Sequence, residues 1–227
     1  AIMMGASQTP PIDLPIPLVG GETAGEATLV NQLRRAEKQE DLAALVFHVD
    51  SPGGDALASD LIGREIERIS QKIPVVVYMG NVAASGGYYV SAYAKSIICQ
   101  PMTITGSIGV FMVRPHTAGL YEKLSVNRTS LQRGKHANLY SDTAPLTDEE
   151  RQILWDGVVQ SYTQFKQVVA AGRNLPIAEL DAICEGRVWT GRQALDHGLV
   201  DTLGDFNTAV QQAAELAELS FTDVHEI

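Results

Sequence analysis

The stretches LAALVFHVDSPGG (residues 42–54) and VVVYMGNVAASGGYY (residues 75–89) decide the fold, because each is an apolar run that ends in a turn of small residues. Short apolar runs bounded by glycine and proline are typical of buried strands. Apolar side chains at helical spacing follow the first turn, over residues 55–70. Because this strand, turn and helix pattern then repeats, the sequence predicts an α/β fold with a mostly parallel sheet flanked by helices.

The same signals extend in both directions from this core. Thr147 and Glu150 form a capping-box pattern at the start of the longest expected helix. Residues 80–84 are expected to be a turn, and residues 105–109 a glycine-punctuated loop. The remaining expected helices are 27–38, 85–94, 120–124, 147–171, 193–197 and 207–219, and the expected strands are 1–4, 42–49, 75–79, 97–99 and 125–131.

The start of the chain suggests that it belongs to a longer protein. It has no initiator Met, and prolines at positions 10, 11, 15 and 17 follow the first apolar residues. We therefore expect a lead-in strand and proline-rich linker over residues 1–24, one domain with a helical C-terminal part over residues 25–219, and a tail over residues 220–227.

Composition excludes several functional classes. The chain has 227 residues, of which 45% are hydrophobic and 19% charged, as in ordinary globular proteins. Its net charge of −10 argues against a nucleic-acid surface, which needs clustered Lys and Arg. Cys99 and Cys184 are too few and too far apart for a disulfide framework or a metal site, so we expect buried thiols, no metal and no cofactor. No apolar run approaches the roughly 18 residues of a membrane span, so this segment itself is expected to be soluble.

Ser85 is the candidate nucleophile. It lies between a predicted strand and a predicted helix, among the small residues Ala83, Ala84, Gly86 and Gly87. At a helix N-terminus, free amides and the helix dipole favour the negative charge that develops when a hydroxyl attacks a carbonyl. The alternative is that Ser85 only caps its helix.

A second turn, Ser51 to Asp55, lies one strand–helix unit earlier, so a parallel sheet would bring it beside Ser85. Its glycines leave backbone N–H groups free to meet a ligand oxygen. We therefore predict that the N–H groups of Gly54 and Gly86 form an oxyanion hole. The alternative is that Pro-Gly-Gly is an ordinary turn. Asp50 and Asp55 flank this turn, and we expect them to fix or cap it rather than to act as acid and base.

Four motifs in order resemble the signal peptide peptidase A (protease IV) family. They are Val49–Gly54, Ala83–Tyr89, Thr105–Phe111, and Val188–Gly191 with Gly198–Asp201, and the resemblance spans residues 25–219. It implies a Clp-protease/crotonase-like fold, a Ser–Lys dyad with Ser85 as nucleophile, and a peptide substrate. It also implies a homo-oligomer at the extracytoplasmic face of a bacterial membrane, with the membrane contact made by parts outside this chain. Tyr88 and Tyr89 would line a substrate groove or pack in the core.

The resemblance fails at the general base. Short members of the family have the catalytic lysine where this chain has Ala137. One explanation is that the chain is the C-terminal half of a long, duplicated member whose N-terminal half supplies the lysine. The second is that Lys135, two residues earlier, serves instead, and the third is that an engineered Lys-to-Ala change traps an inactive enzyme. An exposed Lys135 would stay protonated and could not act as base.

Other functions remain open from the sequence. The main hypothesis is an endopeptidase for short apolar peptides, such as cleaved signal peptides. A phage capsid-maturation peptidase would carry the same Ser85 motif. A crotonase-type acyl-CoA enzyme would also use backbone amides as an oxyanion hole. An inactive scaffold half of a larger assembly would account for Ala137.

Overall fold

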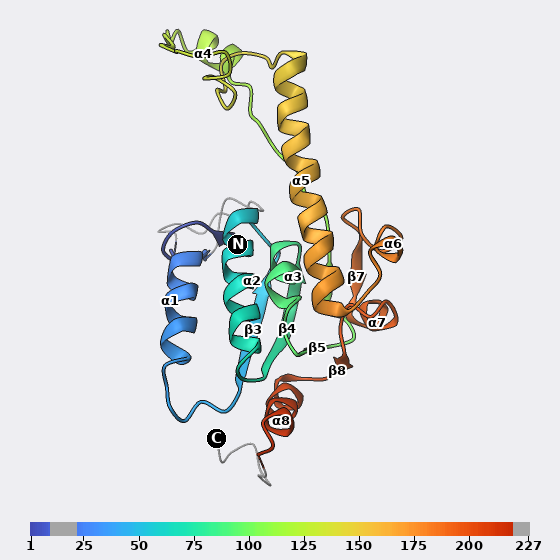
Figure 1. The fold of residues 1–227 in the computed structure, drawn as a ribbon. Helices are drawn as coiled ribbons and strands as arrows, with labels where there is room; N and C mark the ends of the chain where they lie inside the picture. Colours follow the sequence, from blue (N-terminus) through green and yellow to red (C-terminus); the bar gives the residue numbers. More distant parts are fainter. Residues whose placement is uncertain (10–21, 220–227) are drawn as a thin grey trace. The chain divides into compact units, whose positions relative to one another are not determined.

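The structure is a computed structural model that describes residues 1–9 and 22–219 (Figure 1). The proline-rich linker and the tail expected from the sequence lie outside the described residues. The chain divides into two compact units, residues 1–109 with 164–227 and residues 110–163.

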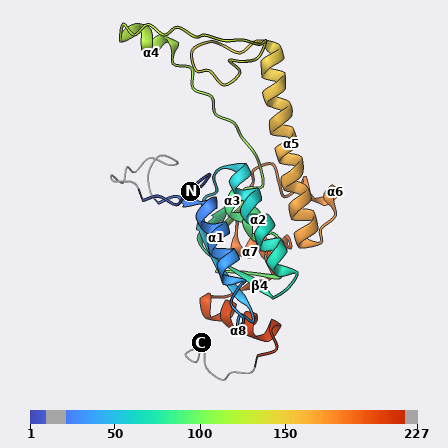
Figure 2. The ribbon, with the colours of Figure 1, turned by 60° about the vertical axis from the view of Figure 1, so that its left-hand side comes forward.

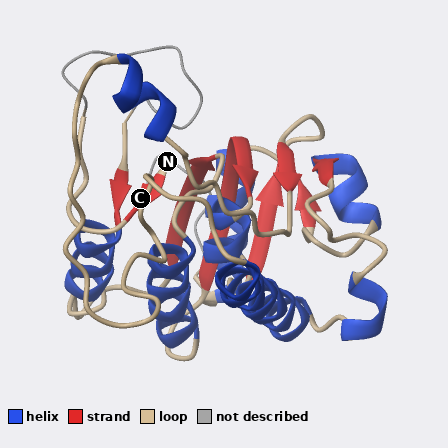
Figure 3. Ribbon diagram, turned by 90° about the horizontal axis from the view of Figure 1, so that it is seen from above, coloured by secondary structure: helices blue, strands red, loops and turns tan. Residues whose placement is uncertain are grey.

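The first unit is built on a six-stranded sheet, and β4 (Val75–Ala84) is its central strand. β4 pairs in parallel with β3 (Leu45–Ser51) and, on successive parts of its length, with β5 (Ser96–Cys99) and β6 (Ile104–Gly106). β8 (Thr202–Leu203) is parallel to β5, whereas β7 (Val188–Thr190) is antiparallel to β6. Figure 3 shows these strands side by side. The predicted α/β fold with a mostly parallel sheet is confirmed.

Helices cover both faces of this sheet. α1 (Glu26–Ala36), α2 (Ala56–Ser70) and the short α3 (Gly86–Ser91) lie next to one another (Figure 2). α8 (Phe206–Leu216) packs on Val76 and Ile98 through Ala209 and Ala213. Because successive strand residues face opposite sides, the fully buried Val75, Val77 and Met79 point away from α8. The core therefore has a layer on each side of β4.

Smaller elements complete this unit. β1 (Ile2–Met3) is parallel to β2 (Ala24–Gly25). α6 (Ile177–Leu180) precedes β7, and α7 (Gly191–Asp196) starts with a capping box between Thr190 and Gln193. Within residues 1–9 and 22–219, no helix has the length and apolar character needed to cross a membrane.

The second unit, residues 110–163, contains α4 (Ala118–Lys123) and the first part of α5 (Asp148–Arg173). The predicted capping box is confirmed, since Thr147 Oγ1 accepts from Glu150 N at 3.2 Å and Glu150 Oε2 accepts from Thr147 N at 2.9 Å. The strand predicted over residues 125–131 is wrong. These residues are exposed, and no described strand pairs with them, so their backbone lacks the ladder that a strand requires.

The turn predicted over residues 80–84 is also wrong, because β4 continues through it. Residues 82–84 pair with β6, and Asp50 Oδ1 accepts from the Val82 amide at 3.1 Å where β3 has a register shift. The residues that resemble a turn in the sequence are instead the last part of this strand. As a consequence, Ser85 follows directly on the end of the central strand.

Two glycines of α5 should respond in opposite ways to alanine. A Cβ on Gly172 would overlap the backbone of Ala92, whereas a Cβ on Gly157 would meet no described atom within 4 Å. We expect Gly172→Ala to lower the free energy of unfolding by about 1–3 kcal/mol through overpacking. Gly157→Ala should raise it by about 0.5–1 kcal/mol through helix propensity. Urea unfolding of both variants checks this, and a neutral Gly172→Ala would contradict the close helix contact.

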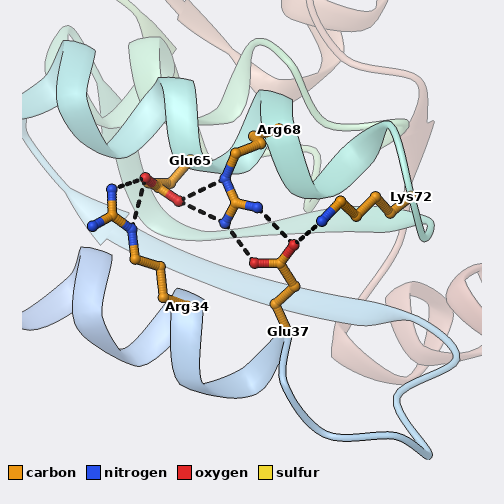
Figure 4. Close-up of polar contacts among 5 residues, drawn as sticks. All are labelled: Arg34, Glu37, Glu65, Arg68 and Lys72. Atoms are coloured by element: carbon orange, nitrogen blue, oxygen red, sulfur yellow. Dashed lines mark hydrogen bonds and ion pairs between the residues drawn. The ribbon is translucent and has the colours of Figure 1, made fainter.

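An ion-pair network joins α1 to α2 (Figure 4). Glu37, just after α1, accepts from Arg68 at 2.6 Å and pairs with Lys72. Glu65 of α2 is buried and pairs with Arg34 of α1 and with Arg68. Hydrogen bonds from Arg68 and Lys72 lower the pKa of Glu37 to about 2. The network therefore ties the two helices while Glu37 is ionised.

This network predicts an acid-sensitive part of the stability. A carboxyl whose pKa is lowered by folding stabilises the protein above its unfolded pKa, roughly 4.3 for Glu. That contribution should be lost as the pH falls from there toward the pKa of Glu37, about 2. Glu37→Gln should therefore flatten the fall of the melting temperature across this window. An unchanged pH profile in the variant would show that Glu37 does not contribute.

Candidate active site

Ser85 stands at the point where β4 ends and α3 begins. Its backbone has φ 52° and ψ −120°, a left-handed conformation that non-glycine residues rarely adopt. The Ser85 amide donates to Gly106 O at 2.9 Å, and its carbonyl accepts the first helical bond from Tyr89 N at 2.8 Å. Its half-buried hydroxyl caps no amide of α3, so the capping alternative does not describe this serine.

The Gly53–Gly54 turn lies against Ser85. A Cβ on Gly53 would be 2.8 Å from both Gly86 N and Ser85 Cβ, and 3.0 Å from Ala84 O. Gly54 N is 3.2 Å from where a Cβ on Gly86 would lie. The carboxyl ends of β3 and β4 therefore bring the two turns together, as parallel strands do. The structure places Gly53 against the Ser85 side chain, and the amide nitrogen of Gly54 beside Gly86.

Strand β1 holds the Gly54 turn in place. Ile2 N donates to Gly53 O at 2.9 Å, and Asp55 N donates to Ile2 O at 2.8 Å. Gly54 lies between the two residues that bond to Ile2, so its own N–H and C=O point away from β1. Ile2 thus leaves the amide of Gly54 free of β1. Asp55 caps α2 by accepting from Ala58 N at 2.8 Å, as the sequence suggested for this carboxylate.

The glycines that follow Ser85 are needed for close packing. A Cβ on Gly86 would overlap Ser59 Oγ, and a Cβ on Gly87 would lie 2.6 Å from Ser51 O. The first contact joins the start of α3 to α2, and the second joins it to the end of β3. Because a side chain at either position would push these elements apart, the glycines allow the two turns to approach.

Ser107 is a candidate site residue that the sequence reasoning missed. Gly106 pairs with Ala84, and its carbonyl accepts from Ser85 N, so Ser107 follows directly on the neighbouring strand end. Ser107 is half-buried and, like Ser85, is left-handed, with φ 49°. The sequence signalled only that this serine lies in the glycine-punctuated loop expected over residues 105–109, which does not indicate a place beside Ser85.

The candidate base, Lys135, and the alanine at position 137 lie in the unit of residues 110–163. The Lys135 side chain is 71% exposed, and its ammonium pairs with Glu149 at 2.6 Å. His136 lies 3.4 Å from Glu149. Ala137 occupies the position at which the family resemblance expects a lysine. Within its own unit, Lys135 is therefore a solvated ion-pair partner.

The remaining candidates are structural. Tyr88 is fully buried and Tyr89 is 6% exposed, so both pack in the core rather than line an open groove. Cys99 and Cys184 are buried free thiols, as expected, and burial raises the pKa of each to about 11. Among residues 1–9 and 22–219, no group of three or more His, Cys, Asp or Glu side chains is placed to hold a metal ion.

The chain matches a peptidase family and is similar to proteins named as proteases. Residues 67–220 match peptidase family S49. The chain is 38% identical over 84% of its length to the chloroplastic serine protease SPPA of Arabidopsis thaliana, and 39% identical over 86% to protease 4 of Haemophilus influenzae. It spans only 28% and 32% of the lengths of these two proteins.

Two further similarities extend the comparison. A putative protease of Synechocystis sp. is 37% identical over 90% of this chain, which covers 74% of that protein. The fold is similar to that of a ClpP1 mutant from Listeria monocytogenes, with a TM-score of 0.56 at 15% identity, over 82% of this chain and 86% of the other. The expected Clp-protease-like fold is confirmed.

Proposed function

The chain belongs to peptidase family S49, and from this premise we propose that it supplies the nucleophile and the oxyanion hole of a serine endopeptidase. The observation that carries the proposal is the Ser85 hydroxyl, which caps no amide and stands on a left-handed turn between a strand and a helix. Such backbone strain, of order 1–3 kcal/mol, persists where the surroundings enforce it, and it is common at nucleophiles on strand-to-helix turns.

The proposed reaction uses the groups around this turn. Ser85 Oγ attacks the carbonyl carbon of the scissile peptide bond while its proton passes to a general base. The N–H groups of Gly54 and Gly86 donate to the oxygen that becomes negative. The C–N bond then breaks, and the amine leaves with a proton from the base. Water attacks the remaining Ser85 ester in the same way and frees the enzyme.

The general base is proposed to come from outside this chain. Ala137 cannot accept a proton, and Lys135 is exposed and paired with Glu149. A lysine that acts as base near neutral pH needs an apolar setting that disfavours its charged form. A lysine from another segment of the parent protein would meet this need, and the long relatives leave room for such a segment.

The proposed substrates are short apolar peptides, such as cleaved signal peptides at a bacterial membrane. The unit of residues 110–163 exposes large apolar side chains, among them Phe111 (73%), Val113 (77%) and Leu131 (95%). Exposed apolar surface of this kind is typical of contact with another chain or a membrane. We therefore propose that this unit contacts another copy of the chain when the parent protein self-assembles. Membrane contact is proposed to come from other segments of the parent protein.

Labelling with a fluorophosphonate probe tests the proposed function. The full-length protein should form a covalent adduct at Ser85, identified by mass spectrometry of the modified peptide, and should cleave an apolar peptide. A crotonase-type enzyme or an inactive scaffold would leave Ser85 unmodified. Since Ala137 favours the scaffold alternative for the isolated chain, the full-length protein is the decisive sample.

Two substitutions at Gly54 test the role of its amide. A Cβ at this position would overlap the carbonyl oxygen of Ile2, so Gly54→Ala and Gly54→Pro both disturb the β1 contact. Proline also removes the N–H and fixes φ at about −65°, away from the 159° of Gly54. We expect turnover of Gly54→Pro to fall about 10²–10³-fold below that of Gly54→Ala in steady-state peptide cleavage. Equal turnover in the two folded variants would show that the amide of Gly54 is not an oxyanion donor.

A further inference from the structure

Tyr89 connects the proposed nucleophile to the helices behind it. It lies one helical turn after Ser85, and its amide makes the first hydrogen bond of α3, to Ser85 O. α3 has only six residues, too few for a helix to hold its own conformation. The position of Ser85 must therefore be set by the contacts that α3 makes with its surroundings.

The buried Tyr89 side chain makes these contacts with two other helices. Its hydroxyl donates to Asp60 Oδ1 on α2 at 2.7 Å. Gln164 of α5 donates from Nε2 to the same Asp60 oxygen at 2.8 Å, and to the Tyr89 hydroxyl at 3.3 Å. The Tyr89 ring packs on Phe165, with centroids 4.9 Å apart, and a Cβ on Gly63 would be only 3.4 Å from it. Three helices thus meet at one side chain.

The acceptor in this cluster is a carboxylate. Burial alone would raise the pKa of Asp60, but hydrogen bonds from Arg64, Tyr89 and Gln164 outweigh it and leave the pKa lowered. Arg64 binds the other carboxylate oxygen at 2.6 Å from the surface side. Hydrogen bonds to a charged acceptor are stronger than those between neutral groups. The Tyr89 hydroxyl is therefore held firmly at one end of the ring, while its amide holds Ser85 at the other.

We propose that Tyr89 and Asp60 are positioning residues that keep Ser85 in its left-handed conformation, with its hydroxyl directed at the substrate. The inference rests on the proposed function, since it assumes that Ser85 is the nucleophile. A strained residue keeps its conformation only while its surroundings over-determine it. Without the Tyr89–Asp60 bond, α3 can shift and relax the turn, and a displacement of about 1 Å at a reacting group can lower a rate about 10²-fold.

The test measures rates and binding separately in the full-length protein. Tyr89→Phe keeps the ring and removes only the hydroxyl. We expect kcat and the rate of fluorophosphonate labelling to fall about tenfold, with KM unchanged. Asp60→Leu should show the same loss, whereas Asp60→Asn keeps an oxygen that can accept from Tyr89 and should recover most of the rate.

Two control variants separate positioning from general stability. Arg64→Lys keeps a cation four residues after Asp60 and leaves Tyr89 untouched, so its rates should stay within about twofold of the wild type. Asp205→Ala removes the N-terminal cap of α8, which accepts from Thr208 N at 2.9 Å, and lowers stability away from Ser85. It should leave kcat unchanged at a temperature where every variant is folded.

The outcomes are distinguishable. No adduct at Ser85 in the wild type would reject the nucleophile assignment, and the positioning role with it. An adduct that forms equally fast in wild type, Tyr89→Phe and Asp60→Leu would reject the positioning role alone. If Asp205→Ala slowed labelling as much as Tyr89→Phe, the effect would be one of stability, and the positioning role would again be rejected. If Tyr89→Phe fails to fold, the contrast between Asp60→Leu and Asp60→Asn decides in its place.

Discussion

Ser85→Ala should reduce peptide hydrolysis by the full-length protein to background, a loss of about 10⁴-fold or more. Alanine removes the attacking oxygen, and the oxyanion donors alone provide only a small residual rate. The matched control is Ser91→Ala in the same helix, where the hydroxyl donates to Gly87 O at 2.7 Å and faces the core. That variant should keep wild-type turnover. Retention of hydrolysis by Ser85→Ala would falsify the nucleophile assignment.

The same position should show a trade-off between activity and stability. Glycine adopts a φ of 52° without the cost that a side chain incurs. Ser85→Gly should therefore be as inactive as Ser85→Ala but more stable than it, by about 1 kcal/mol in urea unfolding. Equal stability of the two variants would show that the turn relaxes when the hydroxyl is lost.

The second large effect concerns the isolated chain, which should fold but cleave peptides at least about 10³-fold more slowly than the full-length protein. A serine without a general base is a poor nucleophile at neutral pH. Ala137 cannot serve, and Lys135 is held in solvent by Glu149. In the isolated chain, the proposed Ser–Lys dyad therefore lacks its proton acceptor.

The assay compares the isolated chain with the full-length protein on one apolar peptide, each with and without Lys135→Ala. We expect Lys135→Ala to change neither sample, because the proposed base is a lysine from another segment. Glu149→Gln releases Lys135 from its ion pair, and it tests whether this pairing is what prevents Lys135 from acting as base. Efficient cleavage by the isolated chain that disappears on Lys135→Ala would make Lys135 the base and reject the split dyad.

The sequence predicted the architecture because the apolar runs of β3, β4 and α2 are long and strongly patterned. The prediction failed where the structure of a segment depends on whether another strand lies beside it. The apolar residues 126 and 131 suggested a strand, but strand formation needs a neighbouring backbone, which the described residues do not provide. Residues 80–84 had the composition of a turn, although pairing with β6 makes them the end of the central strand.

The sequence predicted the part of the candidate site that follows from two successive strand–helix units. Two successive strand–helix turns had to meet at one sheet edge, which placed Gly54 near Ser85 without a structure. Distances along the chain do not reveal which side chains meet across helices. Asp60 and Gln164 are 104 residues apart and meet at Tyr89 only through helix packing. Ser107 was equally hidden, because its left-handed backbone is not encoded by a residue type.

The left-handed turn at residue 85 also restricts which nucleophile evolution could place there. Threonine carries the same hydroxyl, but its branched Cβ makes a φ of 52° far more costly than it is for serine. A cysteine has an unbranched Cβ and would fit the backbone as serine does. Substitution among nucleophiles at this position is thus filtered first by main-chain geometry and only then by reactivity. We expect Ser85→Cys to fold like the wild type and Ser85→Thr to lose the turn.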